Sequence, residues 1–171
     1  GCVARRMQTD FCHGLLGMGV VVQDRCADGV HIRREAAAAI TAHARRESPR
    51  ECCGLLVGTA REVREAVATA NVAAEPHRHY QVSPADHVAL IRRCREAASG
   101  DSESAEIIGV YHSHPRSAPV PSSTDQRDAW ADFLYVIAGP IDGSAPLALR
   151  AYWLVNGDFE DVLLGGEPPS D

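Results

Sequence analysis

The stretch GVYHSHPRSAPVPSSTD, residues 109–125, places a strand end, a loop and a helix start in direct succession. The residues that lead into it, AEIIGVYH at 105–112, form a short apolar run that is typical of a buried strand. Pro115 cannot donate to a strand ladder and turns the chain away. The residues SSTDQRDAWAD at 122–132 then predict a short helix after a proline-rich loop. This order of elements indicates a mixed α/β domain.

Further strands and helices are predicted on both sides of this stretch. A helix at 83–99 has good start chemistry, because Ser83 can cap it and Pro84 fits its first position. Asn156 and Gly157 form a favoured turn pair between two closing strands. The remaining elements are expected as a helix at 33–48 and as strands at 29–32, 51–58, 62–73, 133–139, 147–155 and 158–164. We therefore expect an α/β fold of the α+β type, a single mixed β-sheet flanked by helices.

The predicted domain spans residues 30–165, and the sequence shows no internal repeat and no interdomain linker. Residues 1–29 are expected to form an N-terminal extension that is partly flexible, and residues 166–171 a frayed tail. Arg5 and Arg6 precede a short apolar segment. This segment lacks the longer apolar core and the small-residue cleavage site that a signal peptide would have.

Charge and cysteine content argue against several classes of protein. The chain has 171 residues and a formal net charge of −6, which disfavours nucleic acid as the main partner. No apolar run approaches the roughly 20 residues that a membrane helix needs. The six cysteines form no C-x-x-C pair and suit reduced thiols better than a disulfide framework. We expect a cytoplasmic protein that binds neither nucleic acid nor a membrane, and the composition leaves its oligomeric state open.

The spacing of His112, His114 and Asp125 predicts a metal site. Side chains two residues apart at a strand end point to the same face, so both imidazoles can reach one ion. Asp125 falls in the first turn of the next helix, and the loop can return that turn to the strand end. Two nitrogens and one carboxylate oxygen suit zinc, and three protein ligands leave a fourth position open, as in catalytic zinc sites. The chemistry implied is hydrolysis.

Hydrolysis also needs a general base for the water and a hydrogen-bond donor for the developing oxyanion. Glu51, at the start of the buried run ECCGLLVG, is the best candidate for the base, and Ser122 is the natural donor. Simpler interpretations stay open for these residues. Ser122 and Asp125 could merely cap a helix, and Glu51 could be a solvated carboxylate. Cys53 is expected to fill core space, and an H-x-H pair alone is more often a surface or packing feature.

The complete set of motifs resembles the JAMM motif of the MPN-domain zinc metalloproteases. The motif consists here of Glu51, the block HSHP at 112–115, and the S-x-x-D unit of Ser122 and Asp125. Other segments that resemble the family are PRECCGLLVG at 49–58, YQVSPAD at 80–86 and EIIGVYHSHP at 106–115. The resemblance extends from Val30 to Leu164, and five chemically meaningful positions match at once.

The resemblance implies a role for each motif residue. It implies that Zn²⁺ is bound by His112, His114 and Asp125, that Glu51 is the acid and base, and that Ser122 stabilises the tetrahedral intermediate. The family fold is a mixed sheet between helices, similar to that of the cytidine deaminases. The deaminase signature H-x-E…P-C-x-x-C is absent from this sequence.

The family hydrolyses amide bonds, often the isopeptide bonds of ubiquitin or ubiquitin-like tails, and its compact bacterial members resemble peptidases of sulfur-carrier proteins. We therefore expect a zinc peptidase that cuts an amide bond at the C-terminal glycine of a ubiquitin-like sulfur carrier, with release of cysteine as one form of the reaction. His79, Tyr80 and Val82 are expected to line the groove for the tail. The alternatives are a non-catalytic MPN scaffold that holds a partner, a deubiquitinase-like isopeptidase with another substrate, and a DNA-associated relative.

Overall fold

A computed structural model describes residues 29–98 and 106–166, which contain three helices and eight strands. In chain order the elements are β1 (Val30–Ile32), α1 (Arg34–Glu47), β2 (Cys53–Thr59), β3 (Glu62–Thr69), α2 (Pro84–Ala98), β4 (Glu106–Ser113), α3 (Ser123–Asp128), β5 (Leu134–Gly139), β6 (Ala148–Val155), β7 (Asp158–Val162) and β8 (Leu164–Gly165). The predicted extension and tail lie almost wholly outside the described residues, so the domain boundaries stay predictions. Within the described ranges, no helix combines the length and apolarity needed to cross a membrane.

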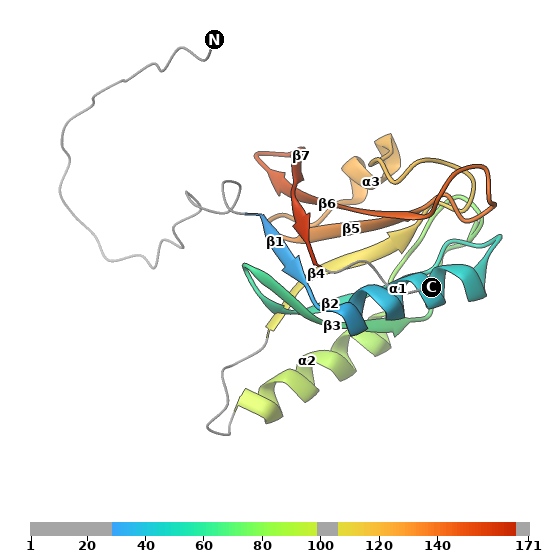
Figure 1. The fold of residues 1–171 in the computed structure, drawn as a ribbon. Helices are drawn as coiled ribbons and strands as arrows, with labels where there is room; N and C mark the ends of the chain where they lie inside the picture. Colours follow the sequence, from blue (N-terminus) through green and yellow to red (C-terminus); the bar gives the residue numbers. More distant parts are fainter. Residues whose placement is uncertain (1–28, 99–105, 167–171) are drawn as a thin grey trace, which may run out of the picture.

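All eight strands form one mixed sheet in the order β7-β6-β5-β4-β2-β3-β1-β8. Figure 1 shows β1 to β7 of this sheet. β4 runs parallel to β5, β1 runs parallel to β3 and β8, and the other neighbours are antiparallel. Only Leu163 separates β7 from β8, yet these strands lie at opposite ends of the order. The sheet must therefore curl. The predicted fold class, a single mixed sheet flanked by helices, is confirmed.

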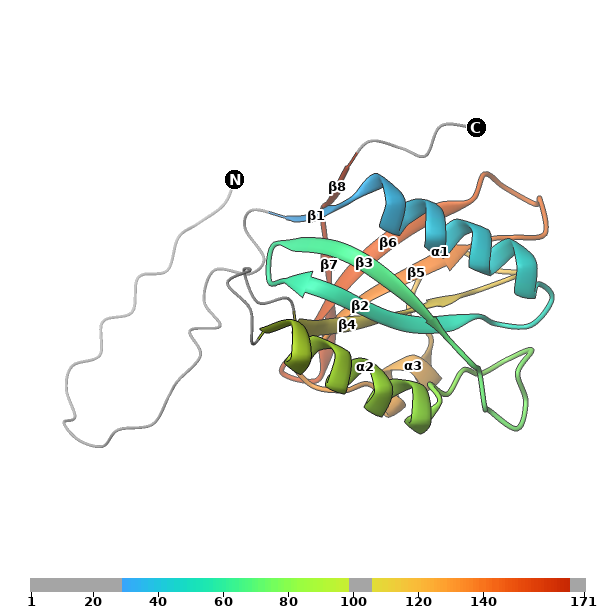
Figure 2. The same cartoon turned by 90° about the horizontal axis from the view of Figure 1, so that it is seen from below.

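The helices α1 and α2 cover opposite faces of the sheet (Figure 2). Because successive residues of a strand point to opposite faces, each strand contributes to two cores. Leu56 belongs to the core under α1, whereas Leu55 belongs to the core under α2. Cys52 and Cys53 divide in the same way. Burial of each large aliphatic side chain contributes roughly 1.5–3 kcal/mol, so both faces contribute to stability.

Two predicted strands are shorter in the structure. β3 ends at Thr69 instead of continuing to residue 73, because the chain bends into a loop there. The predicted strand at 158–164 is broken after Val162, and its last residues pair with β1 instead. Val30 donates its N–H to the carbonyl of Leu163 at 2.9 Å, which fixes this change of partner. Such a long-range parallel pairing leaves no local pattern in the sequence.

Candidate active site

The antiparallel neighbours β2 and β4 bring the candidate residues to one end of the sheet. Cys53 lies opposite His112 in the strand register. Continued two residues further, this register places Glu51 beside His114. Glu51, His114 and Ser122 line one cavity of about 570 Å³. The structure thus brings the predicted base and oxyanion donor together with a predicted metal ligand.

The two histidines and the aspartate form a compact buried cluster. Nε2 of His112 lies 3.2 Å from Nε2 of His114 and 3.3 Å from Oδ1 of Asp125, and Nε2 of His114 lies 3.4 Å from Oδ2 of Asp125. Bonds of about 2.0–2.1 Å to a tetrahedral zinc ion would separate neighbouring ligand atoms by about 3.3–3.4 Å. The spacing and the donor types therefore fit zinc. Over the described ranges, no other group of three or more His, Cys, Asp or Glu side chains is arranged to hold a metal.

Charge in the cluster favours cation binding. Burial alone would raise the pKa of Asp125, but hydrogen bonds from both histidines hold the pKa of this carboxyl far below its usual value. Burial lowers the pKa of His112, which keeps that ring neutral. Burial also opposes charge on His114, but its hydrogen bonds to Asp125 and to the carbonyl of Ala118 outweigh this effect and raise its pKa. A carboxylate beside two imidazoles is the ionisation state that a divalent metal needs, because metal binding displaces any remaining imidazole proton.

His114 and His112, two of the candidate metal ligands, are oriented by different contacts. Nδ1 of His114 donates to the carbonyl of Ala118 at 3.1 Å, which leaves Nε2 directed at the cluster. The ring of His112 stacks on Tyr80, with centroids 4.3 Å apart and planes inclined by 16°. Nδ1 of His112 is buried and has no hydrogen-bond partner in the described part of the chain, so stacking on Tyr80 supports this ring from outside the cluster.

Ser122 caps the helix that carries Asp125. The backbone N–H of Asp125 donates to Oγ of Ser122 at 3.1 Å, and the backbone N–H of Ser122 donates to Oδ2 of Asp125 at 2.6 Å. These reciprocal bonds form a capping box at the start of α3, so the simpler capping role is confirmed. In the cap Oγ acts as an acceptor, and its own proton remains available for donation. The predicted oxyanion role is compatible with capping and stays a prediction.

Burial gives Glu51 a pKa suited to proton transfer. Burial raises its pKa to about 7, with the charge of His114 acting against this shift and that of Asp125 adding to it. A carboxyl group that titrates near neutral pH can both accept and return a proton, as a general acid–base residue must.

The adjacent cysteines are not part of the metal-ligand cluster. Burial raises the pKa of Cys52 to about 12 and that of Cys53 to about 11. Sγ of Cys53 lies 3.5 Å from Oγ1 of Thr69, within the core under α2. Cys53 therefore fills core space, as expected.

Asn71 is a positioning residue that sequence reasoning missed. Its side-chain amide donates to the carbonyls of Glu51 at 2.9 Å and His79 at 3.0 Å. Its side-chain oxygen accepts from the backbone N–H groups of Ala73 and Gln81, both at 3.0 Å. The side chain thus ties the predicted base to the loop that carries the predicted groove residues. An asparagine just after a strand is a turn signal, but the sequence does not reveal these partners.

Replacement of Asn71 by alanine is expected to lower both stability and turnover. The variant leaves half-buried backbone N–H and carbonyl groups without a partner, so its free energy of unfolding should fall by about 1–3 kcal/mol. kcat should fall more than KM rises, because the backbone of Glu51 loses its support, while zinc content stays unchanged. Urea unfolding, metal analysis and kinetics would measure these effects. Val72→Ala, which shortens an exposed neighbour in the same loop, is the control. A wild-type kcat for Asn71→Ala would contradict the positioning role.

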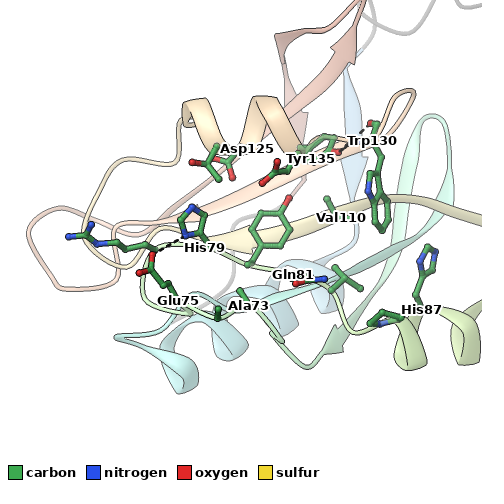
Figure 3. Close-up of a pocket in the computed structure, with 16 residues that line it drawn as sticks. Ala73, Glu75, His79, Gln81, His87, Val110, Asp125, Trp130 and Tyr135 are labelled. Carbon is green, nitrogen blue, oxygen red and sulfur yellow. Dashed lines mark hydrogen bonds and ion pairs between the residues drawn. The ribbon is translucent and has the colours of Figure 1, made fainter.

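The predicted groove residues His79, Tyr80 and Val82 line a second cavity of about 810 Å³. Figure 3 shows Asp125 at one end of this cavity and Trp130 at the other. Its lining combines aromatic and aliphatic side chains, such as Tyr80, Val110 and Tyr135, with polar ones, such as Glu75, Arg78 and Gln81. The cavity therefore leads from a candidate metal ligand along a partly apolar surface, and contact with a substrate stays a prediction.

The mixed sheet, with His112, His114 and Glu51 at adjoining strand ends and Asp125 on α3, defines a class of domain with a candidate metal site. The family of prokaryotic homologues of the JAB domain matches residues 33–155. The chain belongs to this family, which confirms the resemblance to JAMM and MPN domains.

Three named proteins from other organisms are similar in sequence to this chain. The chain is 41% identical over 108 residues to the desampylase of Haloferax volcanii, covering 59% of this chain and 73% of the relative. It is 34% identical over 116 residues to the "Probable TtuB-protein conjugate cleaving protease" of Thermus thermophilus, covering 68% and 70%. It is 30% identical over 134 residues to the CysO-cysteine peptidase of Mycobacterium bovis, covering 74% and 83%.

A solved structure supports the fold. A protein from Desulfitobacterium hafniense matches with a TM-score of 0.68 at 20% identity, covering 81% of this chain and 92% of that one. At this identity the match concerns the fold alone.

Proposed function

We propose that this protein is a cytoplasmic zinc metallopeptidase that hydrolyses the amide bond after the C-terminal glycine of a ubiquitin-like sulfur-carrier protein. The observation that carries the proposal is the spacing of the ligand atoms of His112, His114 and Asp125, which suits tetrahedral zinc, beside the buried carboxyl of Glu51. Two relatives support the substrate class, since one is named for cleavage of a protein conjugate and the other for CysO–cysteine. The free thiols of Cys52, Cys53 and Cys94 favour a reducing compartment.

Each residue of the site has a separate role in the proposed hydrolysis. Zinc held by the cluster would act as a Lewis acid that polarises the scissile carbonyl and makes water more acidic. Glu51 takes a proton from the attacking water, whose oxygen bonds to the carbonyl carbon. Ser122 donates its hydroxyl hydrogen to the developing oxyanion. Glu51 then gives its proton to the amine nitrogen as the carbon–nitrogen bond breaks, so the carboxylate is restored.

The cavity of about 810 Å³ suits an extended tail. The backbone N–H groups of Val72 and Ser83 donate to the carbonyls of Gln81 and Ala70. One side of the segment 81–83 is therefore already hydrogen-bonded. Neighbouring residues of an extended chain direct their backbone groups to opposite sides, which leaves the other side open to an added strand. A terminal glycine has no side chain, so its carbonyl can approach the cluster closely.

The test uses a sulfur carrier with one cysteine attached to its last glycine. Zinc-loaded protein is expected to remove one cysteine residue, seen as a loss of carrier mass, and a chelator should stop the reaction. Survival of this adduct, while ubiquitin isopeptides are cut efficiently, would contradict the sulfur-carrier substrate and favour the deubiquitinase-like alternative. Zinc-loaded protein that cuts neither substrate would favour a non-catalytic scaffold.

A further inference from the structure

We propose that Arg78 and Arg116 bind the α-carboxylate of the departing amino acid, so that the protein selects a single C-terminal residue as its leaving group. This inference rests on the proposed function and deepens it. It assigns a binding site to the cavity of about 570 Å³ that Glu51, His114 and Ser122 line.

Two cavities adjoin the candidate catalytic residues, share Arg78 in their linings and differ in charge. The larger one contains Asp125 and the predicted tail-binding wall, whereas the smaller one contains Glu51, His114 and Ser122. The side chains with a fixed positive charge on the smaller cavity are those of Arg78 and Arg116. Arg78 lines both cavities and so lies at their boundary. If the tail fills the larger cavity, the leaving group enters the smaller one and meets two guanidinium groups.

Both guanidinium groups are available for a ligand. Over the described ranges, neither Arg78 nor Arg116 forms a side-chain hydrogen bond or an ion pair, although Arg116 lowers the pKa of Asp142 through its charge. By contrast, Arg93 pairs with a strand carboxylate, that of Glu65, at 2.7 Å. Two guanidinium groups that form no ion pair within the described residues, beside a candidate catalytic centre, favour an anionic ligand.

The backbone beside Arg116 is fixed relative to the metal-ligand cluster. The carbonyl of Pro115 accepts hydrogen bonds from the N–H groups of Ile141 at 2.9 Å and Asp142 at 3.0 Å. The N–H of His114 donates to the carbonyl of Ala138 at 2.8 Å. This loop also packs tightly on Gly139, where an added Cβ would lie 2.7 Å from the carbonyl of His114. The side chain of Arg116 therefore extends from a firmly held turn.

The backbone beside Arg78 is tied to the predicted base. The N–H of Glu51 donates to the carbonyl of Pro76 at 2.7 Å, and the N–H of Arg78 donates to the carbonyl of Glu75 at 3.0 Å. A turn braced in this way holds Arg78 at a constant distance from the reacting centre. The two arginines thus approach the smaller cavity from separate, fixed loops.

The chemistry of the leaving group explains why this placement confers selectivity. In an adduct between the carrier glycine and one amino acid, a free carboxylate lies one carbon from the scissile nitrogen. Guanidinium groups bind a carboxylate through paired, charge-assisted hydrogen bonds. In an isopeptide to an internal lysine, the scissile nitrogen is Nζ, which is bonded to a methylene group and has no carboxylate one carbon away. The site would therefore favour release of a free amino acid over release of a protein.

The test compares two carriers that differ only at the end of the chain. Both bear one cysteine on the last glycine, and the cysteine ends in a free carboxylate in one and in a carboxamide in the other. The wild-type kcat/KM should be about 10–100-fold higher for the acid, as charge-assisted hydrogen bonds of this kind would give. R78Q and R116Q should each lower kcat/KM for the acid about tenfold and leave the amide nearly unchanged.

Controls separate this inference from folding effects and from the proposed function. R93Q removes a surface arginine on α2 and should change neither rate. Zinc content and the rate on the amide report whether R78Q and R116Q are intact. Equal wild-type rates on both carriers, or equal losses on both in the variants, would overturn the carboxylate site while the proposed function stands. Cleavage of neither carrier would overturn the proposed function and this inference with it.

Discussion

Glu51→Gln is expected to keep its zinc and to lose about 10²–10⁴-fold in kcat. The amide has the size of the carboxyl group and keeps part of its hydrogen bonding, but it cannot accept a proton from water. No metal-ligand atom is removed, because Glu51 lies beside the cluster of His112, His114 and Asp125 without belonging to it. Metal analysis and single-turnover kinetics on the same sample would measure the two properties.

The matched control for this variant is Glu47→Gln. Glu47 is the last residue of α1 and pairs with Arg50 at 2.7 Å near the surface. The same chemical change there should leave turnover within about twofold, because surface ion pairs contribute only about 0–1 kcal/mol. Near-normal turnover of zinc-loaded Glu51→Gln would show that another group serves as the base.

His114→Ala is expected to abolish zinc binding and, with it, hydrolysis. One of three protein ligands is lost, so the variant should contain much less than the roughly one zinc ion per chain expected of the wild type. The remaining pair, His112 and Asp125, cannot define an open tetrahedral site. Elemental analysis after dialysis against a weak chelator would measure the loss. His31→Ala, which removes an exposed histidine on β1, is the control.

The His114→Ala protein should still fold. The two cores lie on the faces of the sheet, and neither contains His114. Circular dichroism should therefore resemble that of the wild type. Undiminished zinc in the folded variant would refute the assignment of His114 as a ligand. Global unfolding would instead show that the cluster contributes more to stability than the two cores indicate.

The local patterns of the sequence predicted most elements of the fold. The apolar run before His112 became β4, and the turn at Asn156 and Gly157 joins β6 to β7 with the positive φ angles that such a turn needs. The pairing of β8 with β1 was missed, because it depends on residues more than 130 positions apart in the chain. Local periodicity carries no information on such a pairing.

The candidate site shows the same limit, because local geometry could be predicted from the sequence and tertiary contacts could not. His112 and His114 could be proposed as a pair because strand geometry alone sets their common face. The positioning role of Asn71 could not be predicted, since its four hydrogen bonds join segments that come together only in the folded chain. The stacking of Tyr80 on His112 is likewise a tertiary contact. Residue chemistry is visible in the sequence, whereas the contacts that orient it arise from folding.

The capping box at Ser122 and Asp125 links the ordering of helix α3 to the proposed binding of zinc. The helix α3 has six residues, too few to be stable without help, and Asp125 Oδ2 accepts the bond that secures its first turn. The same carboxylate is the proposed zinc ligand. If bound zinc shifts the ordering equilibrium of the helix start by some factor, thermodynamic reciprocity requires that the ordered helix start raises the affinity for zinc by the same factor. Substitutions within α3, remote from the ligand atoms, would thus shift metal affinity.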